Sequence, residues 1–157
     1  MKFTKMHGIG NDYVYINCFD QQLNNPTDLA VRLSDRHKGI GGDGIILVMP
    51  SEKAGARMRI FNADGSEAEM CGNGLRCVAK FVYDRRLAPD AGSFTVPGAS
   101  DYPHSLELET GAGVLKVGIK TGGDDSVQEI CVNMGTAVLA PERIPVRAEG
   151  ESVIDYP

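Results

Sequence analysis

Residues 59–77 read Arg59-Ile-Phe-Asn-Ala-Asp-Gly-Ser-Glu-Ala-Glu-Met-Cys-Gly-Asn-Gly-Leu-Arg-Cys77, and the rest of the chain can be interpreted around them. The run begins with the pattern of a strand, breaks at Asp64-Gly65, and is expected to continue as a helix just after Cys71. The sulfur of Cys71 therefore stands at a helix start. There the unpaired backbone N–H groups and the helix dipole favour a thiolate over a thiol.

Two glycines follow this cysteine, Gly72 and Gly74, and they allow backbone N–H groups to approach a bound anion closely. A reactive sulfur would then lie beside an anion site. The alternative is structural, because free cysteines are most often small buried apolar residues. The Gly-Asn-Gly sequence and the preceding strand end favour the chemical interpretation.

The composition is that of a globular protein. The chain has 157 residues, 42% of them hydrophobic, which predicts one domain, or two small ones, with a real core. A net charge of -5 argues against nucleic acid as a partner. No apolar run reaches membrane-spanning length. The three histidines, His7, His37 and His104, show no metal-ligand spacing, so neither a metal nor a membrane is expected.

Four cysteines are present: Cys18, Cys71, Cys77 and Cys131. No signal-peptide pattern opens the chain, so we expect reduced thiols in a cytoplasmic protein. On one helix, Cys71 and Cys77 would be separated by a rise of about 9 Å. A disulfide joins Cα atoms within about 7 Å of each other. Neither a disulfide nor a metal site is therefore expected at this pair.

Alternation of apolar and polar residues predicts a chain dominated by strands. Strands are expected at residues 2–7, 13–18, 44–49, 56–62, 105–110, 114–120 and 127–134. Residues 94–97 are compatible with a further short strand, whereas 98–104 are polar and loop-like. Cys131, inside the last strand, is predicted to be a core residue. A helix is expected from Asn25-Pro26 to about residues 37–39, because proline suits the first helical position.

A second helix, expected at residues 72–86, is apolar on most of its faces. Its apolar residues are Leu75, Cys77, Val78, Ala79, Phe81, Val82 and Tyr83. Such a helix is buried rather than lying on a surface. Strands precede and follow it, so a sheet wrapped around a central helix is the economical arrangement.

The glycine-rich segment Gly39-Ile-Gly-Gly-Asp-Gly44 could be mistaken for a nucleotide-binding loop. It follows a helix and precedes a strand, whereas phosphate loops follow a strand and open a helix. It also lacks the Lys-Ser/Thr pair of a Walker motif. No nucleotide cofactor is therefore expected.

Three segments, in this order, resemble the diaminopimelate epimerase family. They are Lys5-Met-His-Gly-Ile-Gly-Asn-Asp-Tyr13, Asp35-Arg-His-Lys-Gly-Ile-Gly-Gly-Asp-Gly44, and Asn62-Ala-Asp-Gly-Ser-Glu followed by Met70-Cys-Gly-Asn-Gly-Leu-Arg-Cys77. The likeness covers nearly the whole chain but only the first half of the family's length. It implies an α+β domain in which a mostly antiparallel, barrel-like sheet wraps around a central helix.

The resemblance also implies an isomerase that works without pyridoxal phosphate or another cofactor. It would interconvert LL- and meso-diaminopimelate, a step toward lysine and peptidoglycan precursors, by a two-cysteine acid/base mechanism. Cys71 would be one catalytic cysteine, and the backbone of Gly72 with the side chain or backbone of Asn73 would hold the α-carboxylate. Asn11 and Asn62 would contact the remaining substrate. The residues alone leave a turn-forming role open for both asparagines.

Some members of the family carry a glutamine where Gly44 stands here, so at this position the resemblance supports a backbone or shape role only. The partner cysteine of the family belongs to a second domain, whose motifs do not occur in this chain. We therefore expect residues 1–140 to form an N-terminal epimerase domain and residues 141–157 an exit segment toward an absent second domain. The chain alone is expected to be inactive, and a homodimer is a further expectation from the family.

Two alternatives stay open. A proline racemase-like or phenazine-biosynthesis-like isomerase domain would share the fold. A non-catalytic ligand-binding or redox module could also use Cys71. The run from Asn62 and the Cys71-Gly-Asn-Gly motif favour the epimerase.

Overall fold

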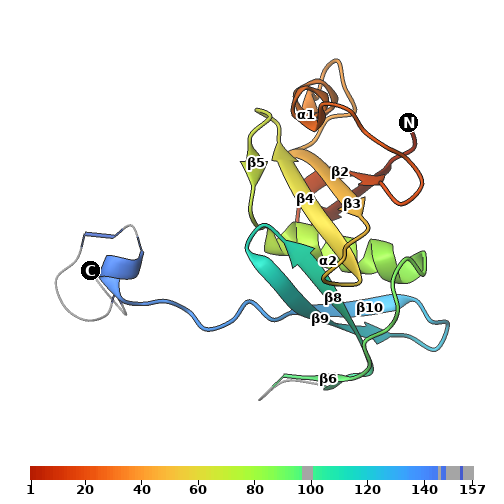
Figure 1. Cartoon of the computed structure of the whole chain (residues 1–157), viewed down its shortest axis with the longest axis vertical. Coiled ribbons are helices and arrows are strands. Elements are labelled where there is room, and N and C mark those ends of the chain that lie inside the picture. The colour runs from red at the N-terminus through yellow and green to blue at the C-terminus, as the bar shows by residue number, and fades with distance from the viewer. Residues whose placement is uncertain (97–100, 145, 148–152, 154–157) are drawn as a thin grey trace.

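A curled sheet around one helix dominates the computed structural model, which describes residues 1–96, 101–144, 146–147 and 153 (Figure 1). The main sheet contains β1 (Thr4–Gly8), β2 (Asn11–Asn17), β3 (Gly44–Met49), β4 (Ala56–Asn62), β5 (Glu67–Ala68), β8 (His104–Thr110), β9 (Gly113–Thr121) and β10 (Val127–Val132). A small second sheet pairs β6 (Phe94–Thr95) with β7 (Asp101–Tyr102). The helices are α1 (Pro26–Ser34), α2 (Gly72–Asp84) and the 3₁₀ turn η1 (Pro141–Arg143).

The strands of the main sheet follow the order β1-β2-β3-β4-β8-β9-β10, with β5 paired to β4. The pairs β2–β3 and β4–β8 are parallel, and the others are antiparallel. A parallel pair places the starts of both strands at the same edge of the sheet. The start of β2 is therefore beside the start of β3, and Tyr13 is opposite Gly44.

Helix α2 lies in the hollow of the sheet, as its apolar composition predicts (Figure 1). Leu75, Val78, Ala79 and Val82 on α2 are fully buried, and they belong to one core cluster with residues from the strands. Helix α1 covers the other face, where a smaller cluster forms around Val14, Ile45 and Phe61. The predicted fold, a mostly antiparallel, barrel-like sheet around a central helix, is thus confirmed.

Several predicted boundaries were wrong for identifiable reasons. Helix α1 ends at Ser34 rather than near residues 37–39. The Asp35 carboxylate accepts the N–H groups of His37 (2.7 Å) and Lys38 (2.9 Å), which forms a turn in place of further helix. Helix α2 ends at Asp84, and Arg86 has a left-handed φ of 52°.

The second half of the chain also differs from expectation. The short strand β5 was missed, and Asp101–Tyr102 form β7 where a loop was expected; residues 97–100 of the predicted strand and loop lie outside the described residues. Strand β10 ends at Val132, after which the chain runs away from the sheet to η1 (Figure 1). Because β10 is an edge strand, Cys131 is half-buried rather than a core residue.

Candidate active site

Cys71 is the N-cap residue of α2. Its backbone is extended, with φ -146° and ψ 108°, and its carbonyl oxygen accepts the first helical bond from the Leu75 N–H at 2.8 Å. Its sulfur accepts the N–H of Gly74 at 3.3 Å. The cysteine thus occupies the position that serine or aspartate usually fills at a helix start. One N–H group of the first turn already points at the sulfur.

The hairpin between β1 and β2 brings Asn11 to this helix start. The turn uses left-handed backbone at Ile9 (φ 55°) and Gly10 (φ 84°). Gly8 packs against the helix, because a Cβ there would be 2.9 Å from the carbonyl oxygen of Asn73. The Asn11 carboxamide oxygen then accepts the Cys71 thiol, with 3.2 Å between oxygen and sulfur. The hairpin tip and the helix start therefore form one unit.

The backbone N–H groups of Gly72 and Asn73 have no acceptor among the described residues. These are first-turn donors, which no helical carbonyl can satisfy. The Asn73 carboxamide oxygen accepts from the Arg76 guanidinium, and its NH₂ group has no acceptor among the described residues. Both the backbone N–H and the side-chain NH₂ of Asn73 are therefore available to a carboxylate.

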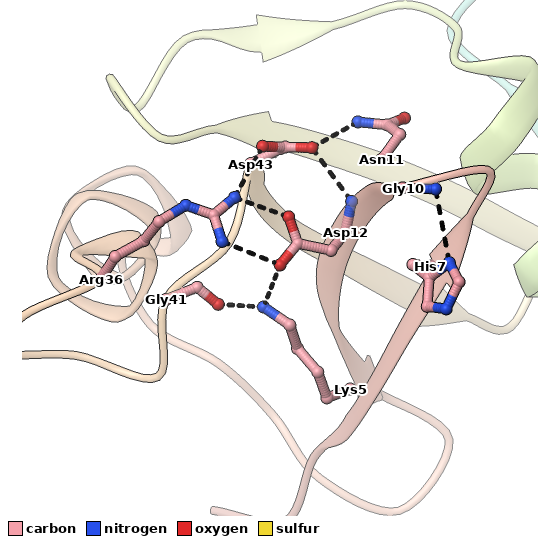
Figure 2. A network of polar contacts seen from close by, with 8 residues as sticks. All are labelled: Lys5, His7, Gly10, Asn11, Asp12, Arg36, Gly41 and Asp43. Atoms are coloured by element: carbon pink, nitrogen blue, oxygen red, sulfur yellow. Dashed lines mark hydrogen bonds and ion pairs between the residues drawn. The ribbon is translucent and has the colours of Figure 1, made fainter.

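A polar network anchors the amide nitrogen of the Asn11 side chain (Figure 2). The Asn11 amide nitrogen donates to Asp43 at 2.6 Å. Arg36 donates to both Asp43 (3.0 Å) and Asp12 (2.7 and 3.1 Å). Lys5 is 2.8 Å from Asp12 and also contacts the carbonyl of Gly41. Hydrogen bonds from Arg36 and Lys5 hold the pKa of Asp12 well below its usual range.

Asn62 ends β4, opposite Gly44 in the register. Its amide nitrogen donates to the Ser66 hydroxyl at 3.0 Å, and no hydrogen bond joins it to Cys71 in the described part of the chain. Position 44 has no room for a side chain, because a Cβ there would be 2.1 Å from the Phe61 carbonyl oxygen. Asn62 thus lies at the sheet edge where β2 and β3 begin, but its side chain closes the β4–β5 turn.

The other cysteines have different surroundings. Cys77 is buried, and burial raises the pKa of its thiol. Cys18 follows the far end of β2, where burial also raises the thiol pKa. All four cysteines are free. Among the described residues, no group of His, Cys, Asp or Glu side chains could hold a metal ion. Nor does any described helix combine the length and apolar character needed to cross a bilayer.

Comparison with known proteins gives this arrangement a family. The sequence model of the family described as diaminopimelate epimerase matches residues 3–140. This chain belongs to the diaminopimelate epimerase family. It is 48% identical to the diaminopimelate epimerase of Acetivibrio thermocellus, over 96% of this chain and 49% of the relative's length. The enzyme of Agathobacter rectalis is also 48% identical, over 99% of this chain and 50% of its own length.

The chain thus spans about half the length of the curated epimerases that it matches. Among solved structures, a phenazine biosynthesis protein of the PhzF family from Bacillus anthracis is similar, with a TM-score of 0.53 and 22% identity. The match covers 80% of this chain and 36% of that protein. It supports the epimerase-type fold and carries no information about substrate.

The sequence patterns did not predict the polar network that anchors the Asn11 side chain. The glycine-rich segment before β3 was considered only for its backbone, although it contains Asp43 and follows Arg36. The single charged residue among these four glycines is a signal that could have been used. What it contacts depends on the parallel β2–β3 pairing, which the sequence pattern does not reveal.

Proposed function

We propose that this chain supplies one half of a diaminopimelate epimerase active site, with Cys71 as its acid/base. The whole enzyme would interconvert LL- and meso-diaminopimelate without a cofactor. The observation that carries the proposal is the composition of the helix start. One sulfur, one carboxamide and two N–H groups without an acceptor in the described part of the chain converge there, within a chain of the epimerase family.

The chemistry explains why these groups would be needed. The α-proton of an amino acid is weakly acidic, and removing it moves charge onto the α-carboxylate. The N–H groups of Gly72 and Asn73 at the positive end of α2 would stabilise that charge. Cys71 would take or return the proton on one face of the α-carbon. Asn11 and Asn62 would contact the remaining substrate, with Asn62 turning from Ser66 to do so.

Inversion also requires a second acid/base on the opposite face, and no other cysteine of this chain suits that role. Cys77 is packed in the core. Cys18 is roughly 20 Å along β2 from Asn11. Cys131 is on the edge strand β10. We therefore propose that residues 1–140 form the first epimerase domain and that 141–157 lead toward a second domain, which supplies the other cysteine. The two halves would be partners in one site, and assembly as a homodimer is part of the same proposal.

The test is a chimera of this chain with the second half of the A. thermocellus enzyme, compared with that parent enzyme. Incorporation of α-deuterium into LL-diaminopimelate in heavy water, with formation of the meso isomer, is the expected result. The chain without the second half should give no inversion. Cys71→Ala should abolish inversion in the chimera, whereas the matched variant Cys131→Ala should retain it.

Either of two outcomes would overturn the proposal. One is a folded chimera without exchange under conditions in which the parent enzyme exchanges. The other is inversion that survives Cys71→Ala. Inversion by this chain alone would retain Cys71 as a catalytic group but refute the claim that its site is half of the complete one.

A further inference from the structure

Asp43 has a fixed position between the strands that border the site. Its backbone N–H donates to the Asp12 carbonyl at 2.7 Å, and its carbonyl accepts the Ala63 N–H at 2.9 Å. These two bonds attach it to the start of β2 and to the end of β4. Its carboxylate is therefore presented to Asn11 by the sheet rather than by a free loop (Figure 2).

The carboxylate of Asp43 meets donors only. One oxygen accepts from the Asn11 amide nitrogen at 2.6 Å and from the Asp12 N–H at 3.0 Å, and the other accepts from Arg36 at 3.0 Å. A carboxylate cannot donate, so the NH₂ end of the Asn11 carboxamide must face Asp43. The carbonyl end must then face Cys71, as observed at 3.2 Å.

This orientation has a chemical consequence for the sulfur. An acceptor that faces a thiol stabilises the S–H form, whereas an N–H donor would stabilise the thiolate. Gly74 offers such a donor on another side of the sulfur, at 3.3 Å. The sulfur of Cys71 therefore meets a hydrogen-bond acceptor, Asn11, on one side and a donor, Gly74, on another. Asp43 determines that Asn11 presents its acceptor end.

We propose that Asp43 is a positioning residue that fixes the Asn11 carboxamide with its oxygen toward Cys71, so that Asn11 accepts the S–H of Cys71 and cannot donate to its sulfur. This role of Asp43 belongs to the same site and rests on the proposed function. Arg36 supports the arrangement by pairing with the second oxygen of Asp43, which also offsets much of the Asp43 charge.

The charged and titratable groups around this pair are Lys5, Asp12, Tyr13, Tyr15, Arg36 and Cys77. A free cysteine ionises around pH 8.5. Burial raises the pKa of Tyr13, Tyr15 and Cys77, so they stay neutral there. Asp12 stays ionised because its pKa is lowered by Arg36 and Lys5.

The test is the pH profile of Cys71 alkylation by iodoacetamide in the chain itself, without substrate. Trypsin cleavage after Arg76 separates the Cys71 peptide from that of Cys77, so mass spectrometry can follow each thiol. In Asp43→Asn the Asn11 carboxamide is free to reverse and to donate to the sulfur. The midpoint of the profile should fall, and alkylation at pH 7 should become about threefold faster or more.

Two controls separate orientation from charge. Asp12→Asn removes a negative charge from the same network without touching the Asn11 carboxamide, so it should shift the profile less. In an Asn11→Ala background there is no carboxamide to orient, and Asp43→Asn should then have a clearly smaller effect. Equal shifts in Asp12→Asn and Asp43→Asn, or equal effects of Asp43→Asn with and without Asn11, would refute the proposal.

The proposal can still be tested if Asp43→Asn does not fold. If circular dichroism shows Asp43→Asn to be unfolded, Asn11→Ala alone still decides. Loss of the acceptor should lower the midpoint, and an unchanged or raised midpoint would overturn the proposal. These readouts need neither substrate nor a second domain. A failed epimerase assay with the expected alkylation shifts would therefore refute the proposed function and leave the positioning role intact.

Discussion

The carboxamide oxygen of Asn11 lies 3.2 Å from the sulfur of Cys71, although 60 residues separate the two in the chain. Asn11 is the first residue of β2, and Cys71 is the N-cap residue of the central helix α2. The contact is maintained from two sides. Gly8 fits the hairpin against the carbonyl of Asn73, and the Asn11 amide is anchored on Asp43. The candidate site can therefore respond to substitutions in the hairpin that leave the buried core unchanged.

The first prediction separates the two roles of Cys71. Its sulfur accepts a first-turn N–H as a helix cap and would also carry the proton in catalysis. A serine oxygen is the better cap. We expect Cys71→Ser to keep or slightly raise the free energy of unfolding, and Cys71→Ala to lower it by about 0.5–1 kcal/mol. Both should abolish inversion in the chimera, because alanine has no proton to exchange and a serine hydroxyl ionises far less readily than a thiol.

Urea denaturation of this chain and conversion of LL- to meso-diaminopimelate by the chimera measure the two roles independently. Loss of folding in both Cys71 variants would mean that the residue is structural. Full inversion in Cys71→Ser would mean that no thiol is needed at this position.

The second prediction concerns space at Gly44. A Cβ at this position would be 2.1 Å from the Phe61 carbonyl oxygen and 2.9 Å from Cε1 of Tyr13. Since the first of these atoms is backbone, the strands themselves would have to move. We expect Gly44→Ala to lower the free energy of unfolding by about 2–3 kcal/mol. A glutamine here, as in some members of the family, would need a different spacing between β3 and β4.

Gly123→Ala is the matched control for that substitution, because nothing lies within 4 Å of a Cβ at Gly123 and its backbone is outside the left-handed region. Its effect should stay within about 0.5 kcal/mol. Thermal or urea denaturation of both variants checks the contrast. Similar stabilities for the two would show that β3 and β4 separate easily.

The sequence predicted local structure well wherever short-range patterns determine it. The bounds of β3 and β4 were predicted correctly, because runs such as Gly44–Met49 are strongly apolar and are bordered by turn residues. The start of α2 at Gly72 and the capping role of Cys71 followed from the same local signals. The end of α1 did not, because the Asp35 side chain captures two N–H groups that the apolar pattern cannot register.

The site was predicted only in part, and the reason is physical. Cys71, Gly72 and Asn73 adjoin in sequence, so the motif brings them together. The contact of Asn11 with Asp43 needs the parallel pairing of β2 and β3, which puts the starts of both strands at one edge. Alternation of apolar and polar residues does not distinguish parallel from antiparallel neighbours. The functions assigned to all five site residues remain predictions. The side chains of Asn62 and Asn73 contact Ser66 and Arg76.

The third prediction is the pH dependence of stability from Asp12, whose side chain is 19% exposed and pairs with Arg36 and Lys5. These partners lower the pKa of Asp12 in the folded chain below the value near 3.9 of an unfolded one. A carboxylate with a lowered folded pKa contributes stability above the unfolded pKa and loses it as the pH falls through the folded one. Because Arg36 is 57% exposed, solvent screens the pair. The contribution at pH 7 should therefore be about 1 kcal/mol.

Asp12→Asn should accordingly be less stable than the parent chain by that amount at pH 7, and the difference should narrow steadily below about pH 4. Asp20→Asn is the control, since Asp20 is exposed and forms no ion pair in the described part of the chain. Urea denaturation of the three proteins between about pH 2.5 and pH 7 measures the effect. A difference between Asp12→Asn and the parent that stays constant over this range, or that widens toward acid, would show that the Asp12 carboxylate does not stabilise the fold through its charge. In that case its hydrogen bonds to Arg36 and Lys5 would matter only for the local geometry beside Asn11.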